Sequence, residues 1–347
     1  MSTVDTAQSG ADVIPEPNGT VQSSRRRSHP VLSFVARRIV AGLLTLFVAS
    51  ILIFIALTVV PGDVAEVVLG RNATPDRVAD VRSQLHLDDS LPSRYWSWAS
   101  GIATGDLGNS MASLAQGQVV PVSGVIKTPM RNSLILAGLT LLFFIPICLV
   151  LATWASLRAG RKADHAISTT SLAIGSLPEF LLGTLLIVIF FSELGWFPAV
   201  STSETPLSDP KGLVLPILTL LAVSVAFGTR ILRASMVEIL REDYVAMARL
   251  NGIKERRVVM RYVLRNSLAP SIQALAQVAQ YLIGGIIITE SLFNYPGIGQ
   301  VLVQAVLVRD PQVVSIVAII LAAIYILINI LADLAVVFLV PRLRSEL

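Results

Sequence analysis

Six long apolar stretches constrain this chain more than any other feature of its sequence. Each can cross about 30 Å of hydrocarbon as an α-helix, which takes about 20 residues. Because a bilayer offers no water to satisfy backbone groups, such continuous stretches must be helical, and they lack the alternation of a barrel strand. We predict an all-α membrane protein with six transmembrane helices. The expected spans are 39–60, 132–153, 166–192, 213–235, 269–293 and 313–340.

The composition agrees with a membrane protein and marks one region that differs from the rest. Hydrophobic residues make up 54% of the 347 residues, which is more than a soluble core of this length uses. Residues 1–30 are instead rich in Ser, Thr, Gly, Pro and Asn and show no apolar periodicity. We therefore expect a disordered tail there, followed by one membrane domain from residue 31 to 347.

Basic residues predict the orientation of the spans. Nineteen of the 27 Lys and Arg residues fall in the N-terminal tail, the second and fourth loops and the C-terminal end. Loops rich in Lys and Arg stay in the cytoplasm during membrane insertion. Both termini should therefore be cytoplasmic, and the long segment 61–131 after the first span should be external.

The external segment contains signals for two short helices. Thr74-Pro75-Asp76 combines a capping residue, an N-terminal proline and an acid, which predicts a helix to about His86. A second helix is expected from about Tyr95 to Ile102. The two tryptophans of that helix, Trp96 and Trp98, suit the membrane interface or internal packing, and solute contact is the alternative.

Motifs for catalysis or metal binding are absent from the sequence. None of the four lysines follows a glycine, so the chain has no phosphate-binding loop of the Gly-Lys-Ser/Thr type. The three histidines are isolated, and Cys148 is the only cysteine. We therefore predict no catalytic residue, no metal site and no cofactor in this chain, which is not an enzyme.

Three ionisable residues lie inside the predicted spans: Glu179, Glu290 and Asp333. A charged group in a bilayer is costly unless it faces protein or water, so each is a candidate for a special role. Glu290 and Asp333 fall near span ends, where structural polar contacts are the main hypothesis and proton relay is the alternative. Glu179 follows Pro178 in mid-span, where a kink toward a cavity would let it line a solute path.

The fourth loop, about 237–268, is long and basic for a connection between spans. We expect the preceding helix to continue over Val237–Val245, a turn at Gly252 and a second basic helix over about Lys254–Leu268. Two hypotheses fit this pattern, namely a docking surface for another protein and a basic anchor on anionic lipid. The small, apolar face available for docking comprises Ala246, Met247, Ala248 and Leu250.

Short characteristic runs extend from Val35 to Arg344. In the fourth loop they are Asp243-Tyr244, Ala248-Arg249, Gly252, Glu255-Arg256-Arg257 and Arg265-Asn266-Ser267-Leu268-Ala269-Pro270. Elsewhere they are Pro61-Gly62-Asp63, Gly105-Asp106-Leu107-Gly108, Ser176-Leu177-Pro178-Glu179-Phe180, Leu194-Gly195-Trp196-Phe197-Pro198-Ala199, Tyr295-Pro296-Gly297-Ile298-Gly299, Arg309-Asp310 and Pro341-Arg342-Leu343-Arg344. In order and spacing, these runs resemble the EAA-loop permeases of ABC importers, and most of all the dipeptide and oligopeptide branch.

The resemblance implies one half of a translocation path in a prokaryotic plasma (inner) membrane. The implied partners are a second, homologous permease, two cytoplasmic ATPases that use ATP and Mg, and an external solute-binding protein. In this family the EAA loop forms a coupling helix that sits in a cleft of the ATPase. That contact would include Asp243, Tyr244, Ala246, Ala248, Arg249 and Gly252. Candidate residues of the path are Glu179, Phe180 and Glu290.

Peptide is the leading substrate that the resemblance implies, with nickel complexes, glutathione and oligosaccharide as alternatives. Three positions depart from the family pattern: Val64 and Asn251 replace a common proline and lysine, and Val340 replaces a frequent aspartate. Outside ABC transport, a proton-coupled carrier using Glu179, Glu290 and Asp333 is the main alternative, although the inverted repeats expected of one are not found. A membrane scaffold or receptor is a third hypothesis.

Overall fold

The computed structural model describes residues 30–58, 64–70, 73–84, 87–201, 203 and 205–339. Within these residues the regular structure is helical, apart from one isolated β-bridge between Asn109 and Pro121. The all-α prediction is therefore confirmed. The expected tail, apart from Pro30, lies outside the described residues, as do the runs at 61–63 and 341–344.

Five helices in the described part of the chain are long and apolar enough to cross a membrane. They are α1 (Pro30–Thr58), α6 (Val122–Leu157), α9 (Pro210–Ile239), α12 (Arg265–Leu292) and α14 (Pro311–Leu339). The helix α6 begins inside the segment that we expected to be external. It extends that far because Val122 and Ile126 are buried against Ile298 and Ile316, so packing stabilises turns that the apolar stretch does not include.

The third predicted span, 166–192, is not one straight helix. It consists of α7 (Lys162–Gly175) and α8 (Glu179–Ile187), with α8 continued by the π-helix η2 (Val188–Glu193), and the two parts are bent by 101°. The break falls at Pro178, which has no backbone N–H and disfavours helical geometry in the residue before it. The expected kink is thus a sharp corner, and Glu179 is the first residue of a new helix rather than a mid-helix residue.

The helix α9 lies at the centre of the bundle, where it packs against α6, α7, α8 and α12. In its most apolar window 67% of the residues are buried, compared with 11% in α1, which packs mainly on α14 at the periphery. Gly228 lets α6 approach closely, because a Cβ there would lie 2.8 Å from the ring of Phe144. Movement of α9 would therefore involve most of the bundle.

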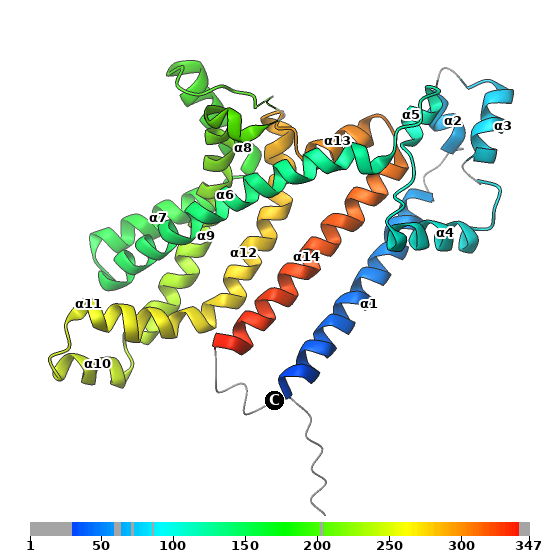
Figure 1. Cartoon of the computed structure of the whole chain (residues 1–347). Helices are drawn as coiled ribbons and strands as arrows, with labels where there is room; N and C mark the ends of the chain where they lie inside the picture. The colour runs from blue at the N-terminus through cyan, green and yellow to red at the C-terminus, as the bar shows by residue number, and fades with distance from the viewer. Residues whose placement is uncertain are drawn as a thin grey trace, which may run out of the picture.

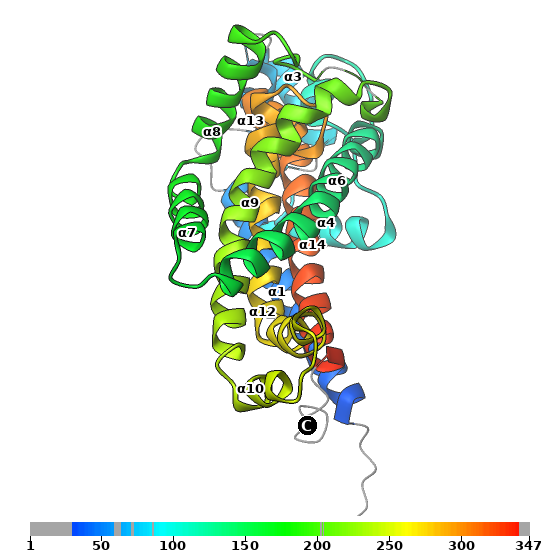
Figure 2. The ribbon, with the colours of Figure 1, turned by 90° about the vertical axis from the view of Figure 1, so that its left-hand side faces the viewer.

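The short helices gather at the two ends of the bundle (Figures 1 and 2). One end carries α2 (Val64–Leu69), α3 (Pro75–Gln84), α5 (Met111–Ala115) and α13 (Ile298–Leu307), with the 3-10 helix η3 (Pro206–Ser208) leading into α9. The other end carries α10 (Asp243–Leu250) and α11 (Glu255–Arg257), together with the start of α1 and the end of α14. The basic fourth loop and the described ends of the chain therefore share one side.

The helices expected in the 61–131 segment are present with small shifts. The helix α3 begins at Pro75 as predicted and is described to Gln84, while α4 (Leu91–Thr104) includes the predicted 95–102 and begins four residues earlier. Trp98 of α4 packs inward and donates to Ser315 Oγ over 3.3 Å, whereas Trp96 is 68% exposed.

Candidate functional site

The fourth loop begins with a corner that the sequence did not predict. The helix α9 ends at Ile239, and α10 starts at Asp243 after an extended Glu242 (φ −68°, ψ 141°). The expected continuous helix over Val237–Val245 is therefore wrong. The acids Glu242 and Asp243 stand at the first positions of α10, where the helix dipole favours negative charge and a new helix can begin.

The helix α10 has one face turned into the protein and one turned outward. Val245 is fully buried and Ala248 is 5% exposed, because both join the apolar cluster formed with α6, α9 and the π-helix η4 (Val258–Leu264). Met247 and Leu250 point outward with exposed fractions of 58% and 82%. The residues of the small, apolar face that we expected therefore do not all lie on one side of α10. Ala248 packs within the chain, while Met247 and Leu250 are exposed.

The end of α10 is fixed by a turn and an ion pair. Gly252 adopts a left-handed φ of 73°, and Ile253 N–H donates to Ala248 O over 3.2 Å. Arg249 pairs with Glu255 through two hydrogen bonds of 2.7 and 3.2 Å. This hydrogen bonding lowers the pKa of the Glu255 carboxyl below its ordinary value. Arg249 therefore helps to orient α10 relative to α11 within the chain.

The second helix of the loop differs from the prediction in its length. The segment expected over Lys254–Leu268 begins as α11, passes through the π-helix η4 and continues without a break into α12. Figure 1 shows that the part around α11 lies across the end of the bundle and that α12 then turns away from it as the fifth span. Tyr244 of α10, which is 40% exposed, accepts a hydrogen bond of 3.2 Å from Asn266 near the start of α12.

Replacing Gly252 by Val is expected to weaken the coupling that the resemblance assigns to α10. A β-branched residue at φ 73° is strained by about 1–2 kcal/mol, so the turn should relax and reorient α10. The readout is ATP hydrolysis stimulated by the loaded solute-binding protein. Gly117→Val is the matched control, because Gly117 also has a left-handed φ (78°), lies in the turn after α5 at the opposite end of the bundle, and a Cβ there meets no neighbour within 4 Å. Equal losses in the two variants would contradict a specific role for Gly252.

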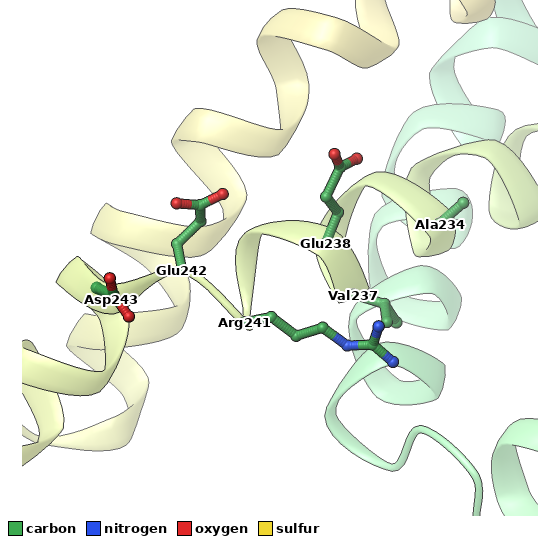
Figure 3. Close-up of a pocket in the computed structure, with 6 residues that line it drawn as sticks. All are labelled: Ala234, Val237, Glu238, Arg241, Glu242 and Asp243. Atoms are coloured by element: carbon green, nitrogen blue, oxygen red, sulfur yellow. The ribbon is translucent and has the colours of Figure 1, made fainter.

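A hollow of about 400 Å³ lies where α9 meets α10 (Figure 3). Its lining carries three carboxylates and one guanidinium, and Glu238 and Glu242 extend toward the same side while Arg241 extends away from both. This arrangement suits a cationic side chain from outside the chain. The residues around it are Ala234, Val237, Glu238, Arg241, Glu242 and Asp243.

Glu179 and Phe180 stand at the corner of the bent span. The Glu179 side chain is only 5% exposed and faces Gly285 on α12, where a Cβ would collide with the carboxylate. Its carboxylate also interacts with the Tyr281 hydroxyl on the same helix. Phe180 is 56% exposed. The corner thus places a carboxylate and an exposed ring at consecutive positions between α8 and α12.

Glu290 and Asp333 make structural contacts inside the chain. Glu290 is fully buried and accepts hydrogen bonds from Ser133 Oγ and, over 2.7 Å, from Gly299 N–H. It therefore ties α12, α6 and α13 together instead of reaching a polar boundary. Asp333 pairs with Arg38 over 3.0 Å and joins α14 to α1. Glu290 contacts Ser133 and Gly299, whereas Glu179 faces Gly285 and Tyr281, so the two carboxylates do not share a site.

Two polar clusters were missed because their members are far apart in sequence. Asp164 at the start of α7 accepts bonds from Gly160 N–H (2.8 Å) and from Arg233 of α9 (2.6 Å to Nη2). Asp310 accepts from Ser110 Oγ (2.5 Å) and from backbone N–H groups at the starts of α5 and α14. The first cluster fixes α9 to α7 ten residues before α10 begins.

Family models match most of this chain. One described as "Binding-protein-dependent transport system inner membrane component" matches residues 145–345. Its companion, described as "Binding-prot-dependent transport system membrane comp, N-term", matches residues 31–121. The matched segments include α10 and the bent span as well as the α2–α5 segment. No group of three or more His, Cys, Asp and Glu side chains that could hold a metal ion is found in the described residues.

Two relatives align with nearly the whole chain. "Probable peptide ABC transporter permease protein y4tP" of Sinorhizobium fredii is 33% identical over 314 residues, covering 90% of this chain and 99% of the relative. "Glutathione transport system permease protein GsiC" of Escherichia coli K12 is 33% identical over 316 residues, covering 91% and 100%. Together with the helical membrane fold and the family models, they show that this chain belongs to the inner-membrane permease family of binding-protein-dependent ABC transport systems.

Proposed function

We propose that this chain forms one half of the transmembrane path of an ATP-driven importer for dipeptides or oligopeptides. The other half is a second, homologous permease, and two ATP-binding subunits that use ATP and Mg drive the cycle from the cytoplasm. An external solute-binding protein delivers the peptide. The end that carries α10 and the described chain ends is cytoplasmic, in agreement with its excess of Lys and Arg.

The outward face of α10 is the observation that carries this proposal. Met247 and Leu250 expose apolar surface next to a basic loop, although the opposite face of the same short helix is packed into the core. An exposed apolar pair on a rigid helix is the arrangement of an interface anchor. Lipid anchoring of the basic loop would not require the Arg249–Glu255 pair and the Gly252 turn, which together set the angle of α10.

The hollow beside α10 adds charge to this surface. Glu238, Glu242 and Asp243 border it, so a Lys or Arg of the ATPase would find carboxylates where α9 meets the start of α10 (Figure 3). Such pairs fix the register of an interface more than they add affinity. We assign Asp243 and Tyr244 to this contact with Ala246 and Arg249 beside them, while Ala248 supports it from within.

Motion at α10 would be transmitted through α9. Only a three-residue turn separates the two helices, and α9 packs against α6, α7, α8 and α12. Approach of the two ATPases would draw the paired α10 helices together and switch the path between inward-open and outward-open states. The α8 corner, with Glu179 and Phe180, packs on α9 and would change its exposure during this switch.

Peptide is favoured as the solute because the relatives are named for peptide and for glutathione, which share amide and carboxylate groups. Glutathione is the second candidate on the same ground. The experiment is ATP hydrolysis by the assembly reconstituted in vesicles with binding protein loaded with short peptides, glutathione or nickel. Stimulation by the peptide-loaded protein supports the proposal. A response to another loaded solute alone would change the proposed substrate. Failure of any ATPase to associate would contradict the proposal that this chain is part of an importer.

Replacing Glu179 by Gln is expected to lower peptide uptake about tenfold at unchanged basal ATP hydrolysis, because a neutral amide binds a peptide's ammonium group more weakly than a carboxylate does. Uptake of labelled peptide into vesicles is the measurement. Glu193→Gln is the matched control, since Glu193 is exposed at the far end of the same bent span. Uptake unchanged by Glu179→Gln would make Glu179 a packing residue.

A further inference from the structure

One face of α12 is exposed and carries polar side chains at helical spacing. Its exposed positions, which follow one another at steps of three or four residues, are Gln277, Tyr281, Gly284, Ile288 and Ser291. This helix also has the least apolar window of the five long helices in the described part of the chain. An amide and two hydroxyl groups are unfavourable against lipid tails. The face therefore suits a water-filled path or a protein partner better than it suits the bilayer.

Tyr281 connects this exposed face to Glu179 at the α8 corner. Tyr281 is 46% exposed, and its hydroxyl donates a hydrogen bond to the Glu179 carboxylate, which is 5% exposed. The Tyr281 ring packs against Phe227 of α9, with the two ring centroids 5.8 Å apart. Because Glu179 is nearly covered while Tyr281 is open, a solute on this face meets the phenol before it meets the carboxylate.

Two glycines leave α12 without a side chain beside this pair. Gly284 lies one turn after Tyr281 on the exposed face, and a Cβ built there meets no atom within 4 Å. Gly285 is packed against the Glu179 carboxylate, with which a Cβ would collide. The exposed face therefore has no side chain between Tyr281 and Ile288, and this open stretch has room for the backbone of a solute.

The carboxylate and the phenol are complementary to an ammonium group. Within the residues that the structure describes, no Lys or Arg forms an ion pair with Glu179. A buried carboxylate is stabilised more by a cation than by a neutral phenol. The phenol oxygen keeps a lone pair after it donates its proton to Glu179, and an ammonium group has three N–H donors. One ammonium can therefore donate to Glu179 and Tyr281 together.

We propose that Tyr281 and Glu179 together hold the α-ammonium group of the peptide in the path. The peptide then lies with its amino terminus at the α8 corner and its backbone beside Gly284. This inference rests on the proposed function, to which it adds Tyr281 as a residue that contacts solute and fixes its orientation. An anionic or neutral solute group at the same place would leave the Glu179 carboxylate without a cation, so the pair selects peptides with a free amino terminus.

The test uses the complete assembly in vesicles and two photoreactive peptides of the same composition. One peptide carries a diazirine side chain on its first residue and the other carries it on its last residue, and the same binding protein delivers both. After irradiation during ATP hydrolysis, mass spectrometry locates the label on the permease. We expect the first-residue probe to label α12 around Tyr281 and α8 around Phe180 at least fivefold more than the last-residue probe does. Equal labelling by the two probes would overturn the proposal.

Replacing Tyr281 by Phe tests the contribution of the phenol. The variant should lower the ratio of first-residue to last-residue label on α8 and α12 about fivefold, because one hydrogen bond that orients the ammonium is lost. A purely structural role would lower both labels and keep their ratio, which would overturn the proposal. Tyr325→Phe is the matched control, since Tyr325 is 45% exposed on α14, and its ratio should equal that of the unmodified permease.

Replacing Gly284 by Leu tests the space beside the pair without changing either polar group. The side chain would occupy the open stretch, so label from the first-residue probe on α12 should fall about fivefold or more. Gly138→Leu is the matched control, because Gly138 is also an exposed helical glycine with no neighbour within 4 Å of a Cβ. Equal label in the Gly284→Leu and Gly138→Leu variants would overturn the placement of the peptide beside Gly284.

Failure of this inference can be separated from failure of the proposed function. If the loaded binding protein does not stimulate ATP hydrolysis by the unmodified assembly, the proposed function fails and this inference fails with it. Stimulated hydrolysis without first-residue label on α8 and α12 would overturn this inference alone. Cross-linking of a photoreactive residue at position 281 to the second permease, and never to peptide, would do the same, because this face of α12 would then be a protein interface.

Discussion

Replacing Leu250 by Ser is expected to reduce ATP hydrolysis coupled to the loaded binding protein by about thirtyfold or more, while the permease still inserts. Leu250 is 82% exposed in the chain alone, so the stability of the permease does not depend on the Leu250 side chain. An apolar anchor at the centre of an interface contributes about 2 kcal/mol or more, which corresponds to this factor. The measurement is the amount of ATPase that copurifies with the permease, together with stimulated hydrolysis.

The matched control is Leu207→Ser at the opposite end of the molecule. Leu207 in η3 is 62% exposed, so the substitution removes a comparable apolar side chain far from α10. We expect normal association and hydrolysis in this variant. Full coupling in Leu250→Ser would contradict the assignment of α10 as the docking helix, and equal losses in both variants would indicate a general effect of lost apolar surface.

Replacing Gly299 by Val is expected to prevent stable folding of the permease. A Cβ at this position would lie 2.5 Å from the backbone Cα of Ile287 and 2.9 Å from Glu290 Oε2. A rigid backbone neighbour cannot yield, so α13 would move away from α12 and the Glu290 hydrogen bonds would be lost. Overpacking costs about 1–3 kcal/mol, and breaking a buried polar network adds a similar amount.

The yield of monodisperse protein in detergent and its thermal midpoint measure this effect. Gly138→Val in α6 is the control. Gly138 lies inside a helix, as Gly299 does, but it is exposed, and a Cβ there meets no neighbour within 4 Å. That variant should retain most of its stability. A Gly299→Val protein as stable as Gly138→Val would mean that α12 and α13 do not approach as closely as the structure places them.

The spans were predictable because the bilayer makes apolar length nearly sufficient to specify a helix. The breaks between helices were not. Pro178 marks a 101° corner, yet Pro129 and Pro146 lie inside the helix α6 without ending it. The difference depends on tertiary packing, since the new helix after Pro178 places Glu179 against α12. A proline alone does not reveal whether a span bends or breaks.

A short helix in the fourth loop was predictable from the sequence, but its bounds and orientation were not. The loop around α10 is recognisable from its charge, its length and its Gly252 turn. Neither proline nor glycine marks the corner before α10, because that corner follows from burial of Val245 and Ala248 in a cluster formed by helices distant in sequence. The Asp164–Arg233 pair, separated by 69 residues, depends on the same long-range packing. Which residues of α10 are buried and which are exposed could therefore be read only from the structure.

Docking of α10 on an ATPase subunit can be tested by photo-cross-linking. A photoreactive amino acid is placed at position 250 in the complete assembly and, as a control, at position 207. We expect position 250 to cross-link to the ATP-binding subunit with a yield that changes on addition of ATP, while position 207 does not reach that subunit. Cross-links from position 250 to lipid alone would exclude docking of α10 on the ATPase.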